Sequence, residues 1–360
     1  KDSSTIGCRL PNFNRYETIE TIRNMLTESQ LKILKKSCFG MFFQLPFGIV
    51  QSQLVHLLLL RQVFQKNSEE LLVDMCGKIM RFGIGEFSVL TGLKCVGVAS
   101  KLLYQCPEDG LFNKFFASGG RLTREAIRLK FLSRCWSNDS DVVKLAILYF
   151  LANYLMGNEL TVGFDLNYVA IIYSEDCNDY PWGKEIFEYF ISHIVGKIFE
   201  TKTSVYNKCR GLIVVLQWWF YEICKKASGL ICLKDDSLIS TIPRMLKWKA
   251  DNSFDREFLV RKFFSLHHDQ FSNIVPTMEE IERLHLDNLF NNNNEFIRHE
   301  DVRHNGSFAP STSNNFDEQI HNLVSGQLQL QADFNSLKLL VHNFSAKVFE
   351  EFKVVHSTLK

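Results

Sequence analysis

Residues 141–156 constrain the fold more strongly than any other stretch of this chain. The segment has a helical pattern, and after Lys144 it is apolar almost all the way round. A helix without a polar face has to be covered on every side. Its apolar run, 145–156, is shorter than the about 20 residues that a membrane-spanning helix needs. The sequence therefore predicts a buried central helix, capped by Ser140, in a domain that does not cross a membrane.

Further segments repeat the helical period of apolar residues. Capping boxes at Thr27–Gln30 and Thr277–Glu280 mark two helix starts, the second for a helix that runs to about Phe290. The helix expected over 123–135 should turn three apolar residues inward, namely Ile127, Phe131 and Leu132. Other helices are predicted over 52–64, 85–93, 165–174, 184–199, 210–227 and 254–265.

Residues 70–82 change to the period of a strand. Two short apolar runs flank Gly77 and Lys78, which predicts a β-hairpin in a helical setting. Residues 242–248 fit a strand or a helix equally well. The expected fold class is therefore mainly α: a multi-helix globular domain with a small β-hairpin near 70–82, then a linker and a C-terminal helix.

Composition divides the chain into four parts. Residues 1–26 are polar and mixed, which favours a loosely ordered N-terminal segment, and residues 27–290 carry the helical domain. Residues 291–315 are rich in Asn and Ser and almost lack aliphatic side chains, so a disordered linker is expected. Residues 316–360 carry an apolar heptad of about four repeats. This predicts an amphipathic helix that either self-associates as a coiled coil or folds back on the main domain.

Charge and cysteine usage restrict the partners. The 41 basic and 40 acidic residues give a net charge of +1, which provides no field to attract a polyanion, so nucleic-acid binding is disfavoured. None of the ten cysteines stands in a C-x-x-C pair, and several lie in apolar runs. This pattern is typical of reduced thiols in an intracellular protein. A protein partner, or self-association through 316–360, is expected instead.

Three motifs resemble a cofactor-binding, catalytic or metal site, but a structural role explains each of them better. The segment 83–88 resembles a dinucleotide-binding turn but has Ser88 in place of the third glycine, and no parallel βαβ unit surrounds it. Cys177 is flanked by carboxylates, which would raise the pKa of its thiol, so a surface-loop cysteine is favoured over a nucleophile. His267 and His268 are adjacent and lack the spacing of metal ligands. We therefore expect no catalytic, cofactor-binding or metal site, and no enzyme.

The aromatic run Trp218–Tyr221 could be a stacking platform, but its apolar surroundings favour core packing. Glu222 follows on the same helix, where a buried carboxylate needs a partner. Arg244 is a better candidate than Arg210 for that role.

Several blocks of the sequence resemble a plant domain of unknown function. The first is similar to its rF-x-x-x-EF-x-x-x-TGL-x-C signature and consists of Phe82, Glu86, Phe87, Thr91, Gly92, Leu93 and Cys95. A later block consists of Tyr180, Pro181, Trp182 and Gly183. The closing blocks include Trp218, Glu222 and the segment 242–244. The resemblance covers roughly residues 30–250.

The resemblance implies a transposon-derived protein, and hence suggests the nucleus. Such domains often lie upstream of a ubiquitin-like (SUMO-type) cysteine protease of Mutator-like elements. The family assigns no catalytic residues to the domain itself, so its motif residues are expected to be structural. The protease's Asp-Cys-Gly nucleophile is not found, because Asp176 and Cys177 are followed by Asn178. Three hypotheses follow: a non-enzymatic interaction domain, an accessory domain of a protease outside this chain, and a transposon DNA-binding domain.

Overall fold

The computed structural model describes residues 16–290, except 64–68, 108–109, 117–120, 137, 196–208, 239–240 and 288. These described residues belong to one compact unit that ends at Asn293. They form twelve α-helices and two small antiparallel sheets of two strands each, so the expected mainly α fold is confirmed. The predicted linker over 291–315 and the C-terminal helix over 316–360 lie outside the described residues, as does most of the N-terminal segment 1–26.

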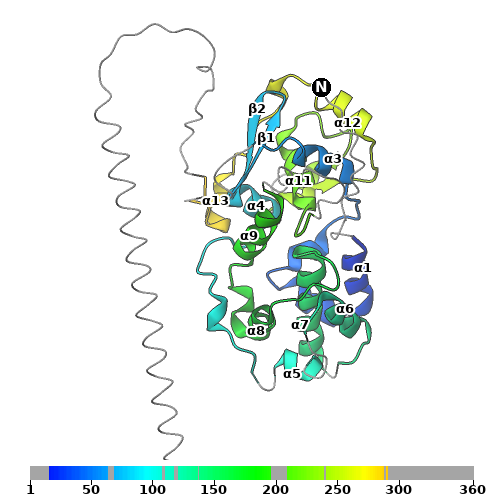
Figure 1. The fold of residues 1–360 in the computed structure, drawn as a ribbon, viewed down its shortest axis with the longest axis vertical. Helices are drawn as coiled ribbons and strands as arrows, with labels where there is room; N and C mark the ends of the chain where they lie inside the picture. The colour runs from blue at the N-terminus through cyan, green and yellow to red at the C-terminus, as the bar shows by residue number, and fades with distance from the viewer. Residues whose placement is uncertain are drawn as a thin grey trace, which may run out of the picture. The chain divides into compact units, whose positions relative to one another are not determined.

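The predicted central helix is α7 (Asp139–Phe150), and its residues from Leu145 to Phe150 are all buried. Neighbouring helices pack on it from several sides (Figure 1). They are α1 (Tyr16–Met25), α2 (Glu28–Lys35), α5 (Leu111–Phe115), α6 (Arg124–Leu132) and α8 (Leu166–Tyr173). The predicted cap was wrong by two residues: Asn138, not Ser140, accepts the amide of Asp141 at 2.8 Å. Ser140 lies inside the first turn.

A π-helical turn, Leu151–Leu155, continues α7. Such a turn leaves carbonyl groups that the regular α-helical pattern would have bonded. The buried guanidinium of Arg124 donates to the carbonyls of Ala152 at 3.0 Å and Met156 at 3.2 Å. Arg124, in the first turn of α6, therefore provides hydrogen-bond donors for carbonyl groups at the end of the central helix.

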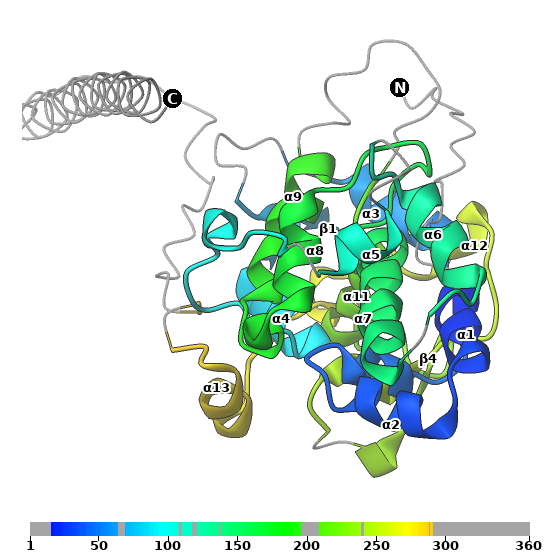
Figure 2. The same ribbon diagram turned by 90° about the horizontal axis from the view of Figure 1, so that it is seen from below.

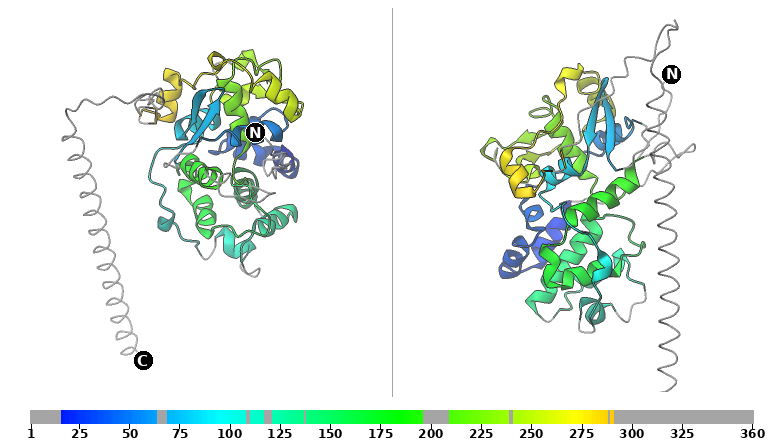
Figure 3. Two further views of the ribbon diagram at one scale, coloured as in Figure 1. Left: turned by 45° about the horizontal axis from the view of Figure 1, so that its top comes forward. Right: turned by 90° about the vertical axis from the view of Figure 1, so that its left-hand side faces the viewer.

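The second half of the unit is built around α11 (Val214–Ile223), which packs on α3 (Ser52–Leu59) and α4 (Ile84–Thr91). Helix α9 (Trp182–Ile194) lies beside α4 (Figure 2). The predicted hairpin is confirmed as β1 (Leu71–Met75) and β2 (Lys78–Phe82), with Leu71 opposite Phe82. It stands at the end of the unit away from α5 and α7 (Figures 1 and 3).

Residues 242–248, which fitted a strand or a helix, contain both. A 3₁₀ turn over Arg244–Lys247 leads directly into β4 (Trp248–Lys249), which pairs with β3 (Leu233–Lys234). The remaining helices, α12 (Arg256–Lys262) and α13 (Met278–Leu284), are shorter than predicted. Both predicted capping boxes are confirmed, at Thr27 and Thr277.

One packing prediction for α6 was wrong. Ile127 and Phe131 are buried, but Leu132 is 37% exposed because it is the last residue of the helix and lies beyond the packed face. Within the described residues, no helix combines the length and the apolar character needed to span a membrane.

Candidate functional site

The motif blocks at 82–95 and 180–183 meet in the fold. The amide of Gly183, at the start of α9, donates to the carbonyl of Lys94 at 2.8 Å. The nearest side-chain atom to an added Cβ at Gly183 would be the Sγ of Cys95, at 2.5 Å. Only glycine allows α9 to approach the segment after α4 so closely. This contact joins two blocks that are almost 90 residues apart in the chain, and it is structural in character.

The residues of the first block form and position α4. The carboxylate of Glu86 accepts the amide of Gly83 at 2.8 Å and so caps the helix from within its first turn. Gly92 ends the helix with a φ of 70°, a conformation that favours glycine. Phe82 precedes the helix, and its ring packs against Phe187 and Trp219, with centroid distances of 6.1 and 5.7 Å. Leu93 is buried below the helix end.

Other motif side chains are buried as well. Phe87 packs on Phe187 with a ring centroid distance of 5.4 Å, and the hydroxyl of Thr91 donates to the carbonyl of Phe87 at 2.8 Å. Pro181 is buried beside Trp182, whose indole N–H donates to the carbonyl of Cys177 at 2.8 Å. Burial raises the pKa of the Glu86 carboxyl, an effect that the nearby Arg81 opposes.

Tyr180 lies next to a partly buried group of polar side chains. The hydroxyl of Tyr168 donates to Glu185 at 2.6 Å, and Lys101 lies 3.0 Å from the same carboxylate oxygen. Burial raises the pKa of Tyr180, and the charge of Glu185 adds to this effect. Lys101 therefore neutralises the charge of Glu185, a buried residue of α9.

Cys177 is not a surface-loop cysteine, and this prediction was wrong. The residue is only 8% exposed and lies beside Cys38, whose Sγ donates to the carbonyl of Cys177 at 3.6 Å. A hydrogen bond from the Cys38 thiol lowers the pKa of Cys177, against the effect of burial. The largest effect on the pKa of this thiol therefore comes from Cys38, which is far away in sequence, and not from the flanking carboxylates.

The histidine pair remains an exposed surface feature. His267 Nδ1 lies 3.2 Å from the Asp269 carboxylate, and both side chains are largely in solvent. Across the described ranges, no group of three or more His, Cys, Asp or Glu side chains has an arrangement that could hold a metal ion.

The predicted partner of Glu222 is confirmed. Arg244 Nη1 donates to Glu222 at 2.9 Å, and the same guanidinium donates through Nε to Glu280 at 2.7 Å. The indole of Trp248 adds a hydrogen bond to Glu222 at 2.8 Å. Burial raises the pKa of Glu280, but the hydrogen bonds from Arg244 outweigh this and hold it below its ordinary value. This ion cluster fixes α11, α13 and the segment before β4 together.

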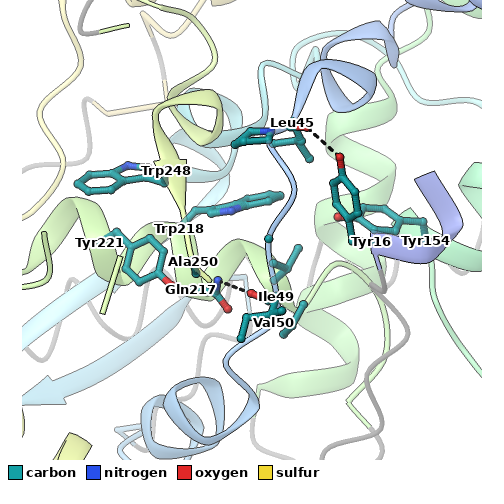
Figure 4. Close-up of a pocket in the computed structure, with 13 residues that line it drawn as sticks. Tyr16, Leu45, Ile49, Val50, Tyr154, Gln217, Trp218, Tyr221, Trp248 and Ala250 are labelled. Carbon is teal, nitrogen blue, oxygen red and sulfur yellow. Dashed lines mark hydrogen bonds between the residues drawn. The ribbon is translucent and has the colours of Figure 1, made fainter. Parts of the chain in front are cut away.

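Beside this cluster, aromatic side chains enclose a small cavity that we call the aromatic pocket (Figure 4). Its volume is about 40 Å³, which is room for about three water molecules or one small apolar side chain. The walls come from α1, the segment after Phe43, the π-helical turn, α11 and β4. They include Tyr16, Pro46, Tyr154, Trp218, Tyr221 and Trp248.

Hydrogen bonds hold the walls of the aromatic pocket in place. Gln217 donates to the carbonyl of Ile49 at 3.0 Å and accepts the amide of Gln51 at 2.6 Å. The hydroxyl of Tyr221 donates to Gln51 at 2.8 Å. In contrast, the indole N–H of Trp218 donates to no group among the described residues, and the fully buried indole without a partner is that of Trp219, which does not line the pocket. The pocket therefore combines a largely apolar lining, held by hydrogen bonds, with the indole N–H of Trp218.

Comparison with known families adds one match. Residues 59–193 match the family model described as Domain of unknown function (DUF1985). The match includes both motif blocks that meet at Gly183. Of the residues that line the aromatic pocket, only Tyr154 lies within the match. A search of the curated proteins and of the solved structures finds no match to the chain.

Sequence reasoning did not find the aromatic pocket. Its walls come from segments near residues 16, 46, 154, 218 and 248, and no local pattern connects them. The only signal was the run Trp218–Tyr221, and the prediction of core packing fits most of it, since all four side chains are largely buried.

Proposed function

We propose that this unit is a non-enzymatic protein-interaction domain that accepts an apolar side chain of its partner in the aromatic pocket. The observation that carries the proposal is the unused indole N–H of Trp218 beside apolar walls. Binding sites are typically apolar with a few placed polar groups, and Trp and Tyr dominate the energetics of protein interfaces. A backbone carbonyl next to the inserted side chain would accept the indole N–H.

The resemblance of residues 82–95 supports a proposal for the biological setting of this domain. A transposon-derived origin and a nuclear location would agree with an interaction domain, as would a role as accessory domain of a SUMO-type protease encoded beside this chain. The gene model around the chain separates these two roles. DNA binding is less favoured because the net charge is only +1.

Self-association through 316–360 is a separate part of the proposal. Light scattering of the chain with and without these residues tests it. A larger particle only for the longer chain is expected, and an identical monomer in both cases would refute it.

Gly48 offers a way to test the aromatic pocket. It lines the pocket, and an added Cβ would lie 3.4 Å from the carbonyl oxygen of Ala250, which is an ordinary contact. Gly48→Ala should therefore fold and leave the pocket open, and Gly48→Leu should fill it.

The experiment is a selection of phage-displayed random peptides on the immobilised full chain. We expect enriched peptides that share an apolar residue, bind the wild-type chain and Gly48→Ala, and lose binding to Gly48→Leu. Their binding should change tryptophan fluorescence, because two tryptophans line the pocket. Enriched peptides that bind Gly48→Leu as well as the wild type, or a selection without enrichment, would contradict the proposal.

A further inference from the structure

A second cavity lies on the other side of β4. Side chains alternate between the two faces of a strand, and in this segment Trp248 and Ala250 line the aromatic pocket while Lys247 and Lys249 line the second cavity. Its volume is about 320 Å³. We call it the lysine pocket, and its walls include Pro46, Leu233, Lys234, Leu246, Lys247 and Lys249. Pro46 lines both pockets.

Lys247 is the unusual residue of this pocket. It is only 9% exposed, and its ammonium makes no hydrogen bond or ion pair with any residue that the structure describes. Burial lowers the pKa of Lys247, and the positive charge of Arg244 adds to this while Glu222 opposes it. A buried charge without a partner is costly. Glu280 also opposes the effect of burial, but neither carboxylate forms an ion pair with Lys247. The ammonium therefore has room to bind an additional anion directly.

The rest of the lining has the same charge preference. Lys234 lies over the ring of Trp248, with 5.7 Å between Nζ and the centroid, and Lys249 pairs at the surface with Asp251 at 3.2 Å. The acidic residue in the lining, Asp235, already accepts the amide and the hydroxyl of Ser237, at 2.9 and 2.6 Å. The lining therefore contains three lysines and one carboxylate, and of the three lysines only Lys249 has an ion-pair partner, Asp251.

Apolar side chains also line the pocket. Leu233 is 56% exposed on β3, and Leu246 is buried. A nucleic-acid backbone would need an exposed stripe of cations, whereas here the central lysine is buried next to leucines. An acidic peptide with apolar residues matches both features, and charge complementarity of this kind contributes specificity and association rate.

We propose that the lysine pocket binds an acidic segment of a partner peptide, with a carboxylate at Lys247 and an adjoining apolar side chain against Leu233 and Leu246. This inference rests on the proposed function as a protein-interaction domain. Because Pro46 is common to both pockets, one extended peptide can place an apolar residue in the aromatic pocket and its acidic neighbours in the lysine pocket.

The test measures fluorescence polarisation with the full chain and a fluorescein-labelled peptide of alternating glutamate and leucine. The matched probe has lysine in place of every glutamate. We expect saturable binding of the acidic peptide only, weakened by salt. Lys247→Gln should reduce the affinity at least about tenfold, and Lys32→Gln, an exposed position on α2, should leave it unchanged. Since Lys247→Gln removes an unpaired buried charge, it should fold, which circular dichroism checks.

Three results would overturn the inference: no binding of the acidic peptide at millimolar concentration, equal binding of the lysine peptide, or unchanged affinity of Lys247→Gln. Competition by duplex DNA as strong as that by unlabelled acidic peptide would also overturn it. The selection with Gly48→Leu is independent of this outcome. Peptides that lose binding to Gly48→Leu but bind Lys247→Gln as well as the wild type would support the proposed function and reject only the acidic ligand.

Discussion

Gly183 contacts Cys95 so closely that the position has no room for a side chain. An added Cβ would lie 2.5 Å from the Cys95 Sγ and within 2.9 Å of the carbonyl oxygens of Leu93 and Lys94. The motif blocks at 82–95 and 180–183 meet at this contact, so packing explains why both belong to the motif. The arrangement also makes a sharp prediction about stability.

Gly183→Ala should lower the free energy of unfolding by about 1–3 kcal/mol, because overpacking at a closed position forces the backbone apart. Urea denaturation measures this, with Gly48→Ala as the control that meets only ordinary contacts. Adding Cys95→Ala should not restore stability, since the two carbonyl oxygens remain in the way. Full recovery in the double variant would show that the thiol alone fills the space.

Arg244→Met should destabilise the unit by about 3–5 kcal/mol, because it leaves the buried Glu280 and the largely buried Glu222 without their cation. The matched control is Arg128→Met, which breaks the more exposed pair with Glu125 and should cost at most about 1 kcal/mol. Chemical denaturation of both variants gives the comparison. Similar losses for the two would mean that the Arg244 cluster is no more than a surface ion pair.

The stability of the unit should fall as the pH drops below about 6.5. His56 on α3 is buried, and burial together with the charge of Arg256 lowers its pKa below the ordinary value of 6.5. The unfolded chain therefore binds a proton at a higher pH than the folded chain, so acidification favours unfolding. His56→Gln should reduce the difference in unfolding free energy between about pH 7.5 and about pH 5.5, whereas His268→Gln, in the 3₁₀ turn His268–Gln270, should leave it intact.

Alkylation by iodoacetamide at neutral pH should distinguish the cysteines. Cys135 is exposed and should react early. Cys95 is buried, and burial raises its pKa to about 12, so little thiolate forms and it should react only after unfolding. Mass spectrometry of the digested protein gives the order. Modification of Cys95 at the rate of Cys135 in the folded chain would contradict the placement of the motif block.

Local features of the fold could be predicted from the sequence because their causes are local. The boxes at Thr27 and Thr277, the hairpin turn near Gly77 and the helix stop at Gly92 each depend on residues within a few positions. The cap of the central helix shows the limit of such reasoning. Asn138 and Ser140 are both good caps, and tertiary packing rather than sequence decides where the helix begins.

Some interior polar contacts could be predicted from the sequence and others could not. Arg244 could be predicted as the partner of Glu222, because a buried carboxylate needs a cation and few were suitable. The neighbour of Cys177 could not, since Cys38 lies in the turn after α2, about 140 positions earlier, and nothing near either cysteine signals the other. The aromatic pocket was missed for the same reason, and also because a tryptophan that lines a cavity has the same sequence context as one in a core.

Pro46 forms a wall of both the aromatic pocket and the lysine pocket. If a ligand proposed for one pocket displaced this ring, it would change the width of the other pocket, and binding at the two pockets would be thermodynamically linked. Such linkage is reciprocal: whatever factor one ligand applies to the affinity of the other is returned unchanged. A single shared ring would then make the two proposed contacts cooperative.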